Sequence, residues 1–256
     1  MTTYAAGTPS WVELSTKDAD GSYAFYSGLF GWTATEGSEE FGGYRTFLDG
    51  DQSVAGLNPM GEFPVWATYV ATDNADDTAE KVKANGGGVI VEPMDVGDLG
   101  RMAVFTDPSG AVIGAWQARE MKGADKCNEP YSFCWNELHA RGFDGVKPFY
   151  AAVFGWDAQP FGEAPEGMPQ YFVWNLGERG IGGGMEMMAD APAEVPSNWL
   201  TWFAVEDRDA TVAKAQELGA AIMMDGLEMP GVGKLAVIAD PQGAAFGVLQ
   251  GEQAAE

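Results

Sequence analysis

The fold of this chain is decided by a stretch that occurs twice, WVELSTKDADGSYAFYSGLFGW over Trp11–Trp32 and WNELHARGFDGVKPFYAAVFGW over Trp135–Trp156. The two copies align without a gap at an offset of 124 residues, and ten of their 22 positions are identical. The identical positions include both tryptophans, the Glu-Leu pair, Phe-Tyr and the closing Phe-Gly-Trp. Identity at this level without a gap indicates that one structural unit has been duplicated.

A second repeated block extends the duplication over most of the chain. Trp66–Gln117 matches Trp199–Gln250 without a gap at an offset of 133 residues, and both blocks contain Asp-Pro-x-Gly before a final apolar segment. The second copy therefore has nine more residues between its two blocks. We expect this longer loop at Phe161–Pro169, a stretch rich in glycine and proline.

Each copy alternates between the patterns of short strands and helices. In the first copy, strands are predicted at residues 11–16, 44–48, 53–57, 67–71, 89–92, 102–106 and 112–117. Helices are predicted at residues 22–30, closed by Gly31, and at residues 75–84. Asp107–Gly110 has the composition of a hairpin turn. The order of elements predicts an α+β fold in which each copy contains two βαβββ modules.

The repeat also predicts the domain limits. We expect an N-terminal tail at residues 1–9, a first domain at 10–120, a linker at 121–130, a second domain at 131–251 and a C-terminal tail at 252–256. The linker region is polar and has no hydrophobic periodicity.

Composition limits the classes of partner and the cellular location that we expect. The chain has 14 Lys and Arg residues against 38 Asp and Glu residues, and the resulting charge of −24 would repel a phosphate backbone, so no nucleic-acid partner is expected. The acidic residues are scattered, which is typical of a solvated surface. The sequence lacks a long apolar run and a secretory signal pattern, so we expect no membrane contact and a cytoplasmic location. Its two cysteines, Cys127 and Cys134, are expected to be reduced.

Several motifs together resemble those of the glyoxalase, bleomycin-resistance and extradiol-dioxygenase superfamily, also called vicinal oxygen chelate proteins. They are Asp-x-x-x-Ser-x-x-Phe-Tyr over Asp18–Tyr26, Leu-Phe-Gly-Trp over Leu29–Trp32, and Asp-Pro-x-Gly before the last strand of each copy. The resemblance covers nearly the whole chain and implies that paired βαβββ modules curl into a half-barrel. The resemblance also indicates where a metal site would lie. Metalloenzymes of the superfamily carry a His on the first strand, a His on the fifth and a Glu on the eighth, all on the concave face.

This chain departs from the superfamily at those metal-ligand positions. They fall on Trp11, Ala67 and Gly114 in the first copy and on Trp135, Leu200 and Gly247 in the second. None of these side chains is a metal donor, and His139 is the only histidine of the chain. We therefore expect no metal and no other cofactor. The departure argues against the ordinary metal-dependent glyoxalase I, dioxygenase, epimerase and fosfomycin-transferase activities.

Side chains two apart on a strand share a face, which predicts the other residues of the concave wall. The expected ligand-binding residues are Trp11, Ser15, Ala67, Tyr69, Val112, Gly114 and Trp116 in the first copy, and Trp135, Leu200, Trp202, Ala245, Gly247 and Leu249 in the second. Large rings beside residues with little side chain predict an apolar slot for an aromatic ligand. The alternative is that the tryptophans fill the half-barrel as core. Val12, Leu14, Phe25 and Phe30 are expected on the opposite, helix-facing side.

Three polar residues on the same wall are the catalytic candidates. Glu13 and Glu137 could act as general bases or bind a ligand, and the alternative is a glutamate at the surface edge or paired with Arg45. His139 lies two residues after Glu137, so the two could form an acid–base pair, or His139 could be a solvated residue at a strand end. The first copy has Ser15 in place of His139, which would confine such chemistry to the second copy.

Two functions follow from this sequence. The first is a metal-independent protein that binds a hydrophobic, aromatic small molecule in sequestration, resistance or transport. The second is a metal-free enzyme of natural-product or small-metabolite metabolism, an isomerase, cyclase, lyase or hydroxylase component, that uses Glu137 and His139. Two copies in one chain supply what many relatives assemble as a homodimer, so a monomer or a weak homodimer is expected. The sequence leaves open the ligand's identity, whether both pockets function, and whether pockets form within or between domains.

Overall fold

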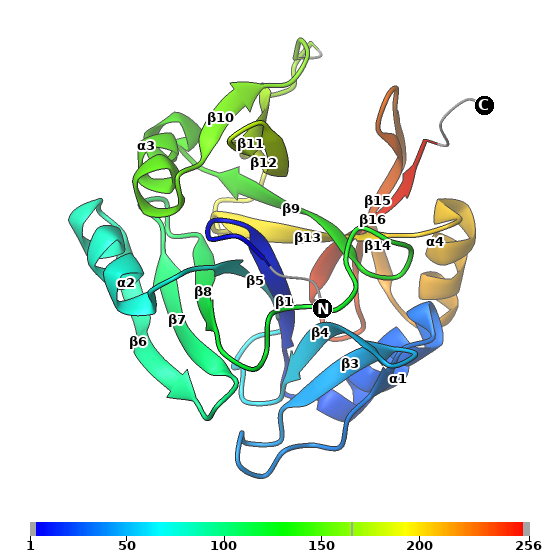
Figure 1. Ribbon diagram of the computed structural model, residues 1–256. Coiled ribbons are helices and arrows are strands. Elements are labelled where there is room, and N and C mark those ends of the chain that lie inside the picture. Colours follow the sequence, from blue (N-terminus) through cyan, green and yellow to red (C-terminus); the bar gives the residue numbers. More distant parts are fainter. Residues whose placement is uncertain (1–3, 165, 253–256) are drawn as a thin grey trace. The chain divides into compact units, whose positions relative to one another are not determined.

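The structure is a computed structural model and describes residues 4–164 and 166–252 (Figure 1). The first copy contains β1 (Pro9–Ser15), α1 (Ala19–Phe30), β2 (Thr33–Ala34), β3 (Arg45–Asp49), β4 (Gln52–Asn58), β5 (Val65–Ala71), α2 (Ala75–Ala84), β6 (Gly88–Val96), β7 (Gly100–Thr106) and β8 (Val112–Ala118). The second contains β9 (Phe133–Ala140), α3 (Phe143–Phe154), β10 (Asp157–Pro160), β11 (Tyr171–Leu176), β12 (Arg179–Glu186), β13 (Asn198–Ala204), α4 (Arg208–Glu217), β14 (Ala221–Met229), β15 (Gly233–Ala239) and β16 (Ala245–Gly251). This order confirms the duplicated βαβββ modules and the α+β class. Most of the predicted C-terminal tail and the first three residues of the N-terminal tail lie outside the described residues.

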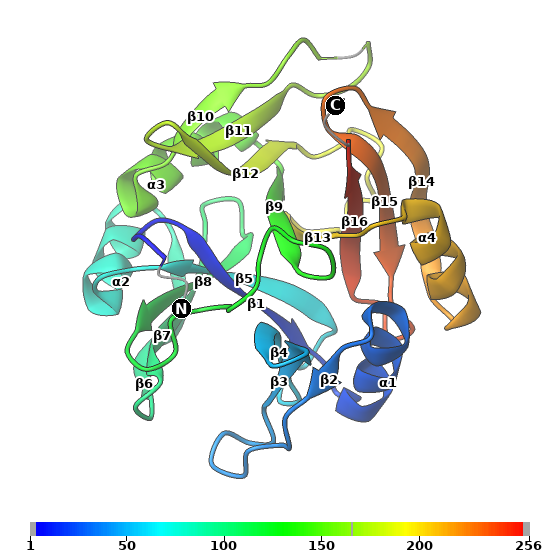
Figure 2. The same ribbon diagram turned by 45° about the vertical axis from the view of Figure 1, so that its right-hand side comes forward.

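The strands of each copy form one eight-stranded mixed sheet (Figure 2). The strand orders are β2-β3-β4-β1-β5-β8-β7-β6 and β10-β11-β12-β9-β13-β16-β15-β14. The pairs β1–β4 and β5–β8 are parallel, and the outer pairs are antiparallel. The strands at the two ends of each sheet are not neighbours, so each sheet is open and is not a closed barrel.

Residue contacts divide the chain into two compact units that each combine modules from both copies. Unit 1 comprises Met1–Trp11, Ala67–Gly123 and Trp135–Leu200, and unit 2 comprises Val12–Trp66, Ala124–Cys134 and Thr201–Glu256. The predicted domain limits coincide with the two copies of the repeat. Each compact unit instead combines one module of the first copy with one module of the second.

The core of unit 1 lies between α2, α3 and the helix-facing sides of their strands. The two helices are side by side (Figures 1 and 2). The first copy contributes Phe105 and Ile113, and the second contributes Leu138 and Trp174, all with no exposed surface. Complete burial of such side chains stabilises a fold by about 1.5–3 kcal/mol each.

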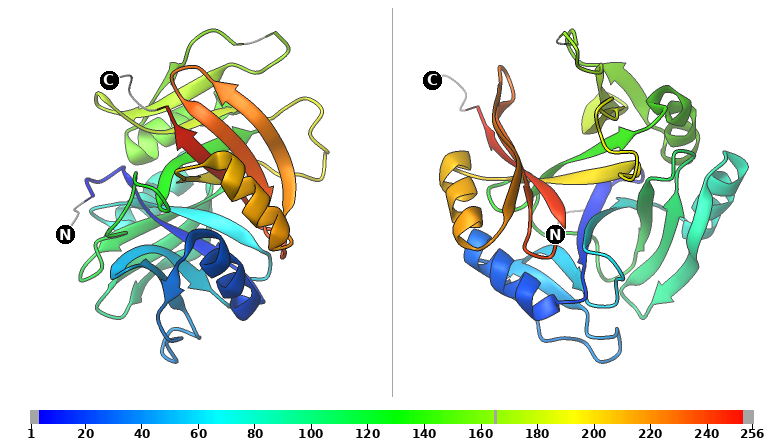
Figure 3. Two further views of the ribbon diagram at one scale, coloured as in Figure 1. Left: turned by 90° about the vertical axis from the view of Figure 1, so that its right-hand side faces the viewer. Right: turned by 180° about the vertical axis from the view of Figure 1, so that it is seen from behind.

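Unit 2 has the corresponding arrangement around α1 and α4 (Figure 3). Rings from both copies pack there edge to face, with Tyr26 5.3 Å from Trp66 and Trp66 5.0 Å from Phe203 between ring centroids. The four residues predicted to face the helices are all buried: Val12, Leu14, Phe25 and Phe30. Trp11 and Glu13 on the other face of the first strand are buried too, so burial does not distinguish the two faces of this strand.

Local side-chain chemistry sets where the helices begin and end. Asp18 caps α1 by accepting a hydrogen bond from the backbone N–H of Gly21, and the helix ends at Gly31 with a left-handed φ of 76°. The position equivalent to Asp18 in the second copy is Gly142, which has no capping side chain. Glu186 of β12 replaces it, because its two carboxylate oxygens accept hydrogen bonds from the N–H groups of Gly142 and Phe143 at 2.8 and 2.7 Å.

The Asp-Pro-x-Gly motifs form the hairpin turns that the sequence predicts. Asp107 Oδ1 accepts hydrogen bonds from the N–H groups of Ser109 and Ala111 at 2.7 and 3.0 Å, and Asp240 repeats this arrangement. The strand registers place three of the nine extra residues of the second copy before β11 and six between β12 and β13, so the prediction of a single longer loop at Phe161–Pro169 was only partly right. Among the described residues, no helix reaches the length and hydropathy needed to cross a membrane.

Candidate functional site

Strand β9 separates core residues from candidate site residues in the way that the sequence predicts. Leu138 and Ala140 belong to the core of unit 1. Trp135, Glu137 and His139 alternate with them and therefore lie on the face away from the helices.

Four residues on this face form a continuous hydrogen-bonded group, which we call the Glu137 cluster: Trp135, Glu137, His139 and Tyr171. The indole N–H of Trp135 donates to Tyr171 Oη at 2.9 Å, and Tyr171 Oη donates to Glu137 Oε2 at 2.8 Å. His139 Nε2 lies 2.5 Å from Glu137 Oε1. The structure thus brings Glu137 and His139 into direct contact, while their catalytic role stays a prediction.

Strand pairing brings Tyr171 to the cluster from a distant part of the sequence. Strand β12 runs parallel to β9 with Gly183 opposite Glu137, and β11 pairs antiparallel with β12. A Cβ atom on Gly183 would lie 1.9 Å from Tyr171 Oη and 2.9 Å from Trp135 Nε1. Glycine at this position is therefore required for the two rings to meet above β12.

The electrostatics of the cluster favour a protonated Tyr171. Burial raises the pKa of Tyr171 well above its usual range, and the neighbouring Glu137 charge raises this pKa further. The tyrosine ring stays partly exposed, while its hydroxyl is held between Trp135 and Glu137. Tyr171 therefore remains a hydrogen-bond donor to the Glu137 carboxylate.

The imidazole of His139 is a partly exposed end of the cluster. Its Nε2 faces the carboxylate, so we assign the ring hydrogen to Nε2, which leaves Nδ1 as the basic nitrogen. Nδ1 has no partner within the described residues, and 24% of the side chain is exposed. A carboxylate that orients a partly exposed imidazole can support proton transfer to or from a bound molecule.

The first copy lacks this arrangement at the equivalent positions. Asn58 donates a hydrogen bond to Glu13 Oε1 at 3.1 Å, and Ser15 stands where the second copy has His139. Arg45, considered as a partner for Glu13, is paired with Asp20 at 2.9 Å. Glu13 is buried, but its surroundings contain no imidazole to act with it.

The open space predicted beside the strand glycines is occupied by rings. A Cβ atom on Gly114 would lie 2.2 Å from the ring of Tyr69, and one on Gly247 would lie 2.2 Å from the ring of Trp202. The expectation of a roomy slot at these glycines was wrong, because each aromatic residue lies flat against the glycine of the neighbouring strand. These glycines serve ring packing.

The remaining predicted ligand-binding residues differ in exposure. Trp11 and Leu200 are buried, Ser15, Ala67, Ala245 and Leu249 are half-buried, and Val112 is 42% exposed. Exposure of Val112 at the first residue of β8 places it at the strand end and outside any enclosed wall.

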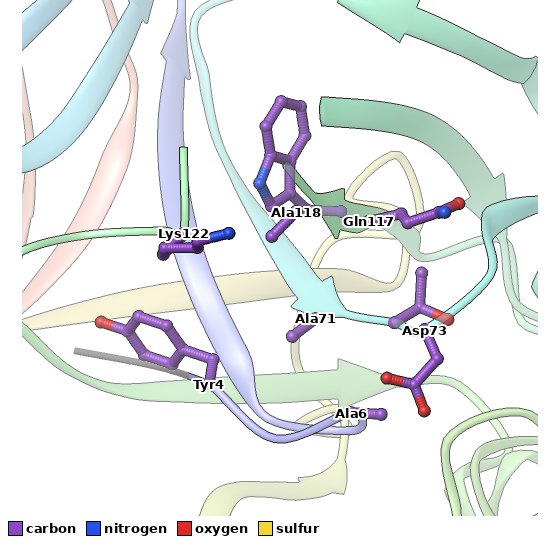
Figure 4. Close-up of a pocket in the computed structure, with 9 residues that line it drawn as sticks. Tyr4, Ala6, Ala71, Asp73, Gln117, Ala118 and Lys122 are labelled. Atoms are coloured by element: carbon purple, nitrogen blue, oxygen red, sulfur yellow. The ribbon is translucent and has the colours of Figure 1, made fainter. Parts of the chain in front are cut away.

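Unit 1 also contains a cavity of about 270 Å³ at the carboxyl ends of the parallel strands β5 and β8 (Figure 4). Its lining residues are Tyr4, Ala6, Ala71, Thr72, Asp73, Trp116, Gln117, Ala118 and Lys122. Trp116 is the one predicted ligand-binding residue among them. Tyr4 and Lys122 escaped the sequence analysis because they lie in the segments expected to be a tail and a linker, where strand alternation gives no signal.

The described residues do not fit the metal that the superfamily resemblance implies. The six equivalent positions carry indole, methyl, isobutyl or no side chains, none of which donates a lone pair to a metal ion. Among residues 4–164 and 166–252, no group of three or more His, Cys, Asp or Glu side chains could hold a metal ion.

Comparison with known sequences matches each copy to a glyoxalase-type family model. Residues 8–114 match the glyoxalase/bleomycin resistance protein/dioxygenase superfamily, and residues 135–249 match a glyoxalase-like domain. A Mycobacterium tuberculosis protein named "Putative glyoxylase CFP32" is 39% identical over 96% of each chain. The anthracycline biosynthesis protein DnrV of Streptomyces peucetius is 37% identical over 98% of this chain and 95% of its own length.

Solved structures share the fold at low sequence identity. The manganese-bound glyoxalase of Novosphingobium aromaticivorans matches with a TM-score of 0.66 at 16% identity, covering 96% of this chain and 82% of its own. The 2,3-dioxygenase LapB of Pseudomonas matches with a TM-score of 0.68 at 12% identity, covering 100% of this chain and 96% of its own. The chain therefore belongs to the glyoxalase/bleomycin resistance protein/dioxygenase superfamily, with two glyoxalase-like domains in tandem.

Proposed function

We propose that this protein binds a hydrophobic, aromatic small molecule without a metal ion, at the Glu137 cluster. The observation that carries the proposal is the chain of hydrogen bonds from Trp135 through Tyr171 and Glu137 to His139. The rings of Trp135 and Tyr171, both partly exposed, offer flat apolar surface, while Glu137 and His139 offer a polar edge. A planar ring system with hydroxyl or carbonyl substituents matches this combination.

The relatives support an aromatic ligand of this kind. Two Streptomyces relatives that match nearly the full chain are named as anthracycline biosynthesis proteins. We extend from those names only the ligand class, a polycyclic aromatic molecule with oxygen substituents. Sequestration, transport and resistance are all compatible with such binding.

A second candidate function, metal-free proton transfer, is favoured by the contact of 2.5 Å between His139 and Glu137. His139 Nδ1 would take a proton from an acidic C–H or O–H of the bound molecule, and Glu137 would stabilise the resulting imidazolium. Return of that proton to another atom of the same molecule completes an isomerisation without a co-reactant. Tyr171 would hold Glu137 in position throughout.

Two variants distinguish binding from catalysis. In calorimetric titration with a hydroxylated anthraquinone, Glu137→Gln and His139→Ala should weaken a pure binder by less than about tenfold. If the protein is an enzyme, turnover of its substrate should fall by about a hundredfold or more in the same variants. Glu62→Gln makes the same change as Glu137→Gln at an exposed position outside the cluster, so it is the control and should change neither quantity.

Two results would contradict the proposal. One is unchanged affinity for the anthraquinone after Trp135→Ala, because the ring of Trp135 is the proposed contact surface. The other is a stoichiometric transition metal in the purified protein whose removal abolishes binding.

A further inference from the structure

The cavity at the carboxyl ends of β5 and β8 is separate in its lining from the Glu137 cluster. None of its nine lining residues belongs to that cluster. We propose that this cavity binds a small planar aromatic anion with a single negative charge, such as an aromatic carboxylate, with the ring against Trp116 and the anionic group at Lys122.

The apolar part of the cavity has the shape and chemistry for one flat ring. Trp116 and Tyr4 supply aromatic surface, and Ala6, Ala71 and Ala118 supply methyl groups that leave space between them. A volume of about 270 Å³ is near the lower end of ordinary ligand pockets, which suits a molecule of one or two rings.

The hydrogen bond that holds the Trp116 side chain also holds the segment that carries Lys122. Its indole N–H donates to the carbonyl oxygen of Met121 at 2.9 Å, so the indole is joined to the residue just before Lys122. The N–H of Met121 donates to the carbonyl oxygen of Leu99 at 3.1 Å. Lys122 Nζ donates to the carbonyl oxygen of Arg119, which turns the ammonium group back over the cavity (Figure 4).

The charges around the cavity select an anion with one negative group. Lys122 extends toward the cavity, and Asp73 lies across it beside Ala6 (Figure 4). A carboxylate at Lys122 gains a charge-assisted hydrogen bond. A second anionic group at the far end of the ligand would approach Asp73, and repulsion between like charges would disfavour it.

The second copy does not reproduce this chemistry. At the positions equivalent to Trp116 and Asp73 it has Leu249 and Glu206, and Tyr131 donates a hydrogen bond to Glu206 at 3.3 Å. The aromatic floor is therefore missing, and the acidic group already has a tyrosine partner. We assign the anion site to unit 1 alone.

The test is a calorimetric titration of the full chain with 2-naphthoate. Lys122→Gln should weaken 2-naphthoate binding by about three- to tenfold, and the neutral 2-naphthylmethanol should bind the unaltered protein more weakly by a similar factor. Lys81→Gln makes the same charge change at an exposed position of α2 that does not line the cavity, so it is the control, with no effect expected. Asp73→Asn should improve binding of 2,6-naphthalenedicarboxylate more than that of 2-naphthoate.

A second variant keeps the test independent of folding. Ala118→Phe fills the cavity from an exposed position and should abolish 2-naphthoate binding while leaving the far-ultraviolet circular dichroism spectrum unchanged. Absence of 2-naphthoate binding at millimolar concentration would overturn the proposal, and so would binding that survives both Lys122→Gln and Ala118→Phe. Loss of anthraquinone binding in Trp135→Ala with intact 2-naphthoate binding would separate this site from the Glu137 cluster.

Discussion

Tyr150 Oη donates a hydrogen bond of 2.9 Å to Asp107 Oδ2, so the Phe-Tyr motif of the second copy is joined to the Asp-Pro-x-Gly motif of the first. Both side chains are buried, and the indole N–H of Trp199 donates to the same tyrosine oxygen at 3.1 Å. In unit 2 the copies exchange roles: Tyr26 donates to Asp240 at 3.1 Å. The two motifs that identify the superfamily in this sequence are thus a structural pair in each unit.

Removal of the Tyr150 hydroxyl should destabilise the protein. Tyr150→Phe leaves the Asp107 Oδ2 atom and the indole N–H of Trp199 without this partner in a buried place, which costs about 1–3 kcal/mol. Urea unfolding followed by tryptophan fluorescence measures the loss. Tyr23→Phe, on the half-buried face of α1, is the control and should change the free energy of unfolding by less than about 0.5 kcal/mol. Equal effects of the two substitutions would contradict a structural role for the pair.

Substitution of Gly183 should disrupt the Glu137 cluster specifically. Gly183→Ala places a methyl group within 1.9 Å of Tyr171 Oη, so the tyrosine must move and its bond to Glu137 is lost. We expect destabilisation of about 1–3 kcal/mol and weaker anthraquinone binding. Gly180→Ala on the same strand meets its first neighbour, a valine methyl group, at 3.1 Å and should be milder. Identical unfolding midpoints and affinities for the two variants would be inconsistent with the steric argument.

Three tyrosines should resist ionisation in the folded protein. Burial, as the largest cause, raises the pKa of Tyr26, Tyr150 and Tyr171 well above the usual value. Their contribution to stability is complete below the unfolded pKa of about 10 and is lost as pH rises above it, because the unfolded state then releases protons that the folded state keeps. An absorbance titration at alkaline pH should show these hydroxyls ionising only together with unfolding. Full ionisation of all eight tyrosines while the native circular dichroism persists would refute this.

Asp240 should shift stability in the acid range. Burial raises the pKa of its carboxyl above the usual value, and hydrogen bonds from the turn oppose this shift in part. The ionised group is therefore penalised in the folded state near neutrality, and the penalty is relieved as pH falls through the raised pKa. Comparison of free energies of unfolding should show that Asp240→Asn is less destabilising, relative to the unaltered protein, at pH 7 than at about pH 4. The opposite order would show that the carboxyl is stabilised in its charged form.

Cys134 should react slowly with thiol reagents. Burial raises the pKa of its thiol to about 12, so almost none of it is thiolate at pH 8. When the native protein is treated with a chromogenic disulfide, the thiol of Cys127 should react before that of Cys134. The Cys134→Ser variant shows how much of the signal comes from Cys127. Rapid labelling of both thiols in the folded protein would contradict this.

The candidate site shows which structural features a sequence pattern can predict. Strand alternation placed Glu137 and His139 on one face, because the period of two is a property of the extended backbone itself. Trp135 was identified in another way, through the superfamily resemblance, which places a metal-ligand position of the metalloenzymes on this residue. Strand alternation did not predict Tyr171, which is 34 residues from Glu137 in the sequence. Tyr171 lies beside Glu137 only because β11 pairs with β12 and β12 pairs with β9.

By itself, the sequence determined the duplication, the order of elements, the superfamily and the loss of metal donors, because these depend on residue identity and short-range periodicity. Tertiary structure alone decided that modules of different copies form each compact unit, and that rings cover Gly114 and Gly247. It also placed Tyr4 and Lys122 around one cavity. These outcomes depend on how strands register and how side-chain volumes fill space between segments far apart in the chain, and no local pattern encodes that geometry.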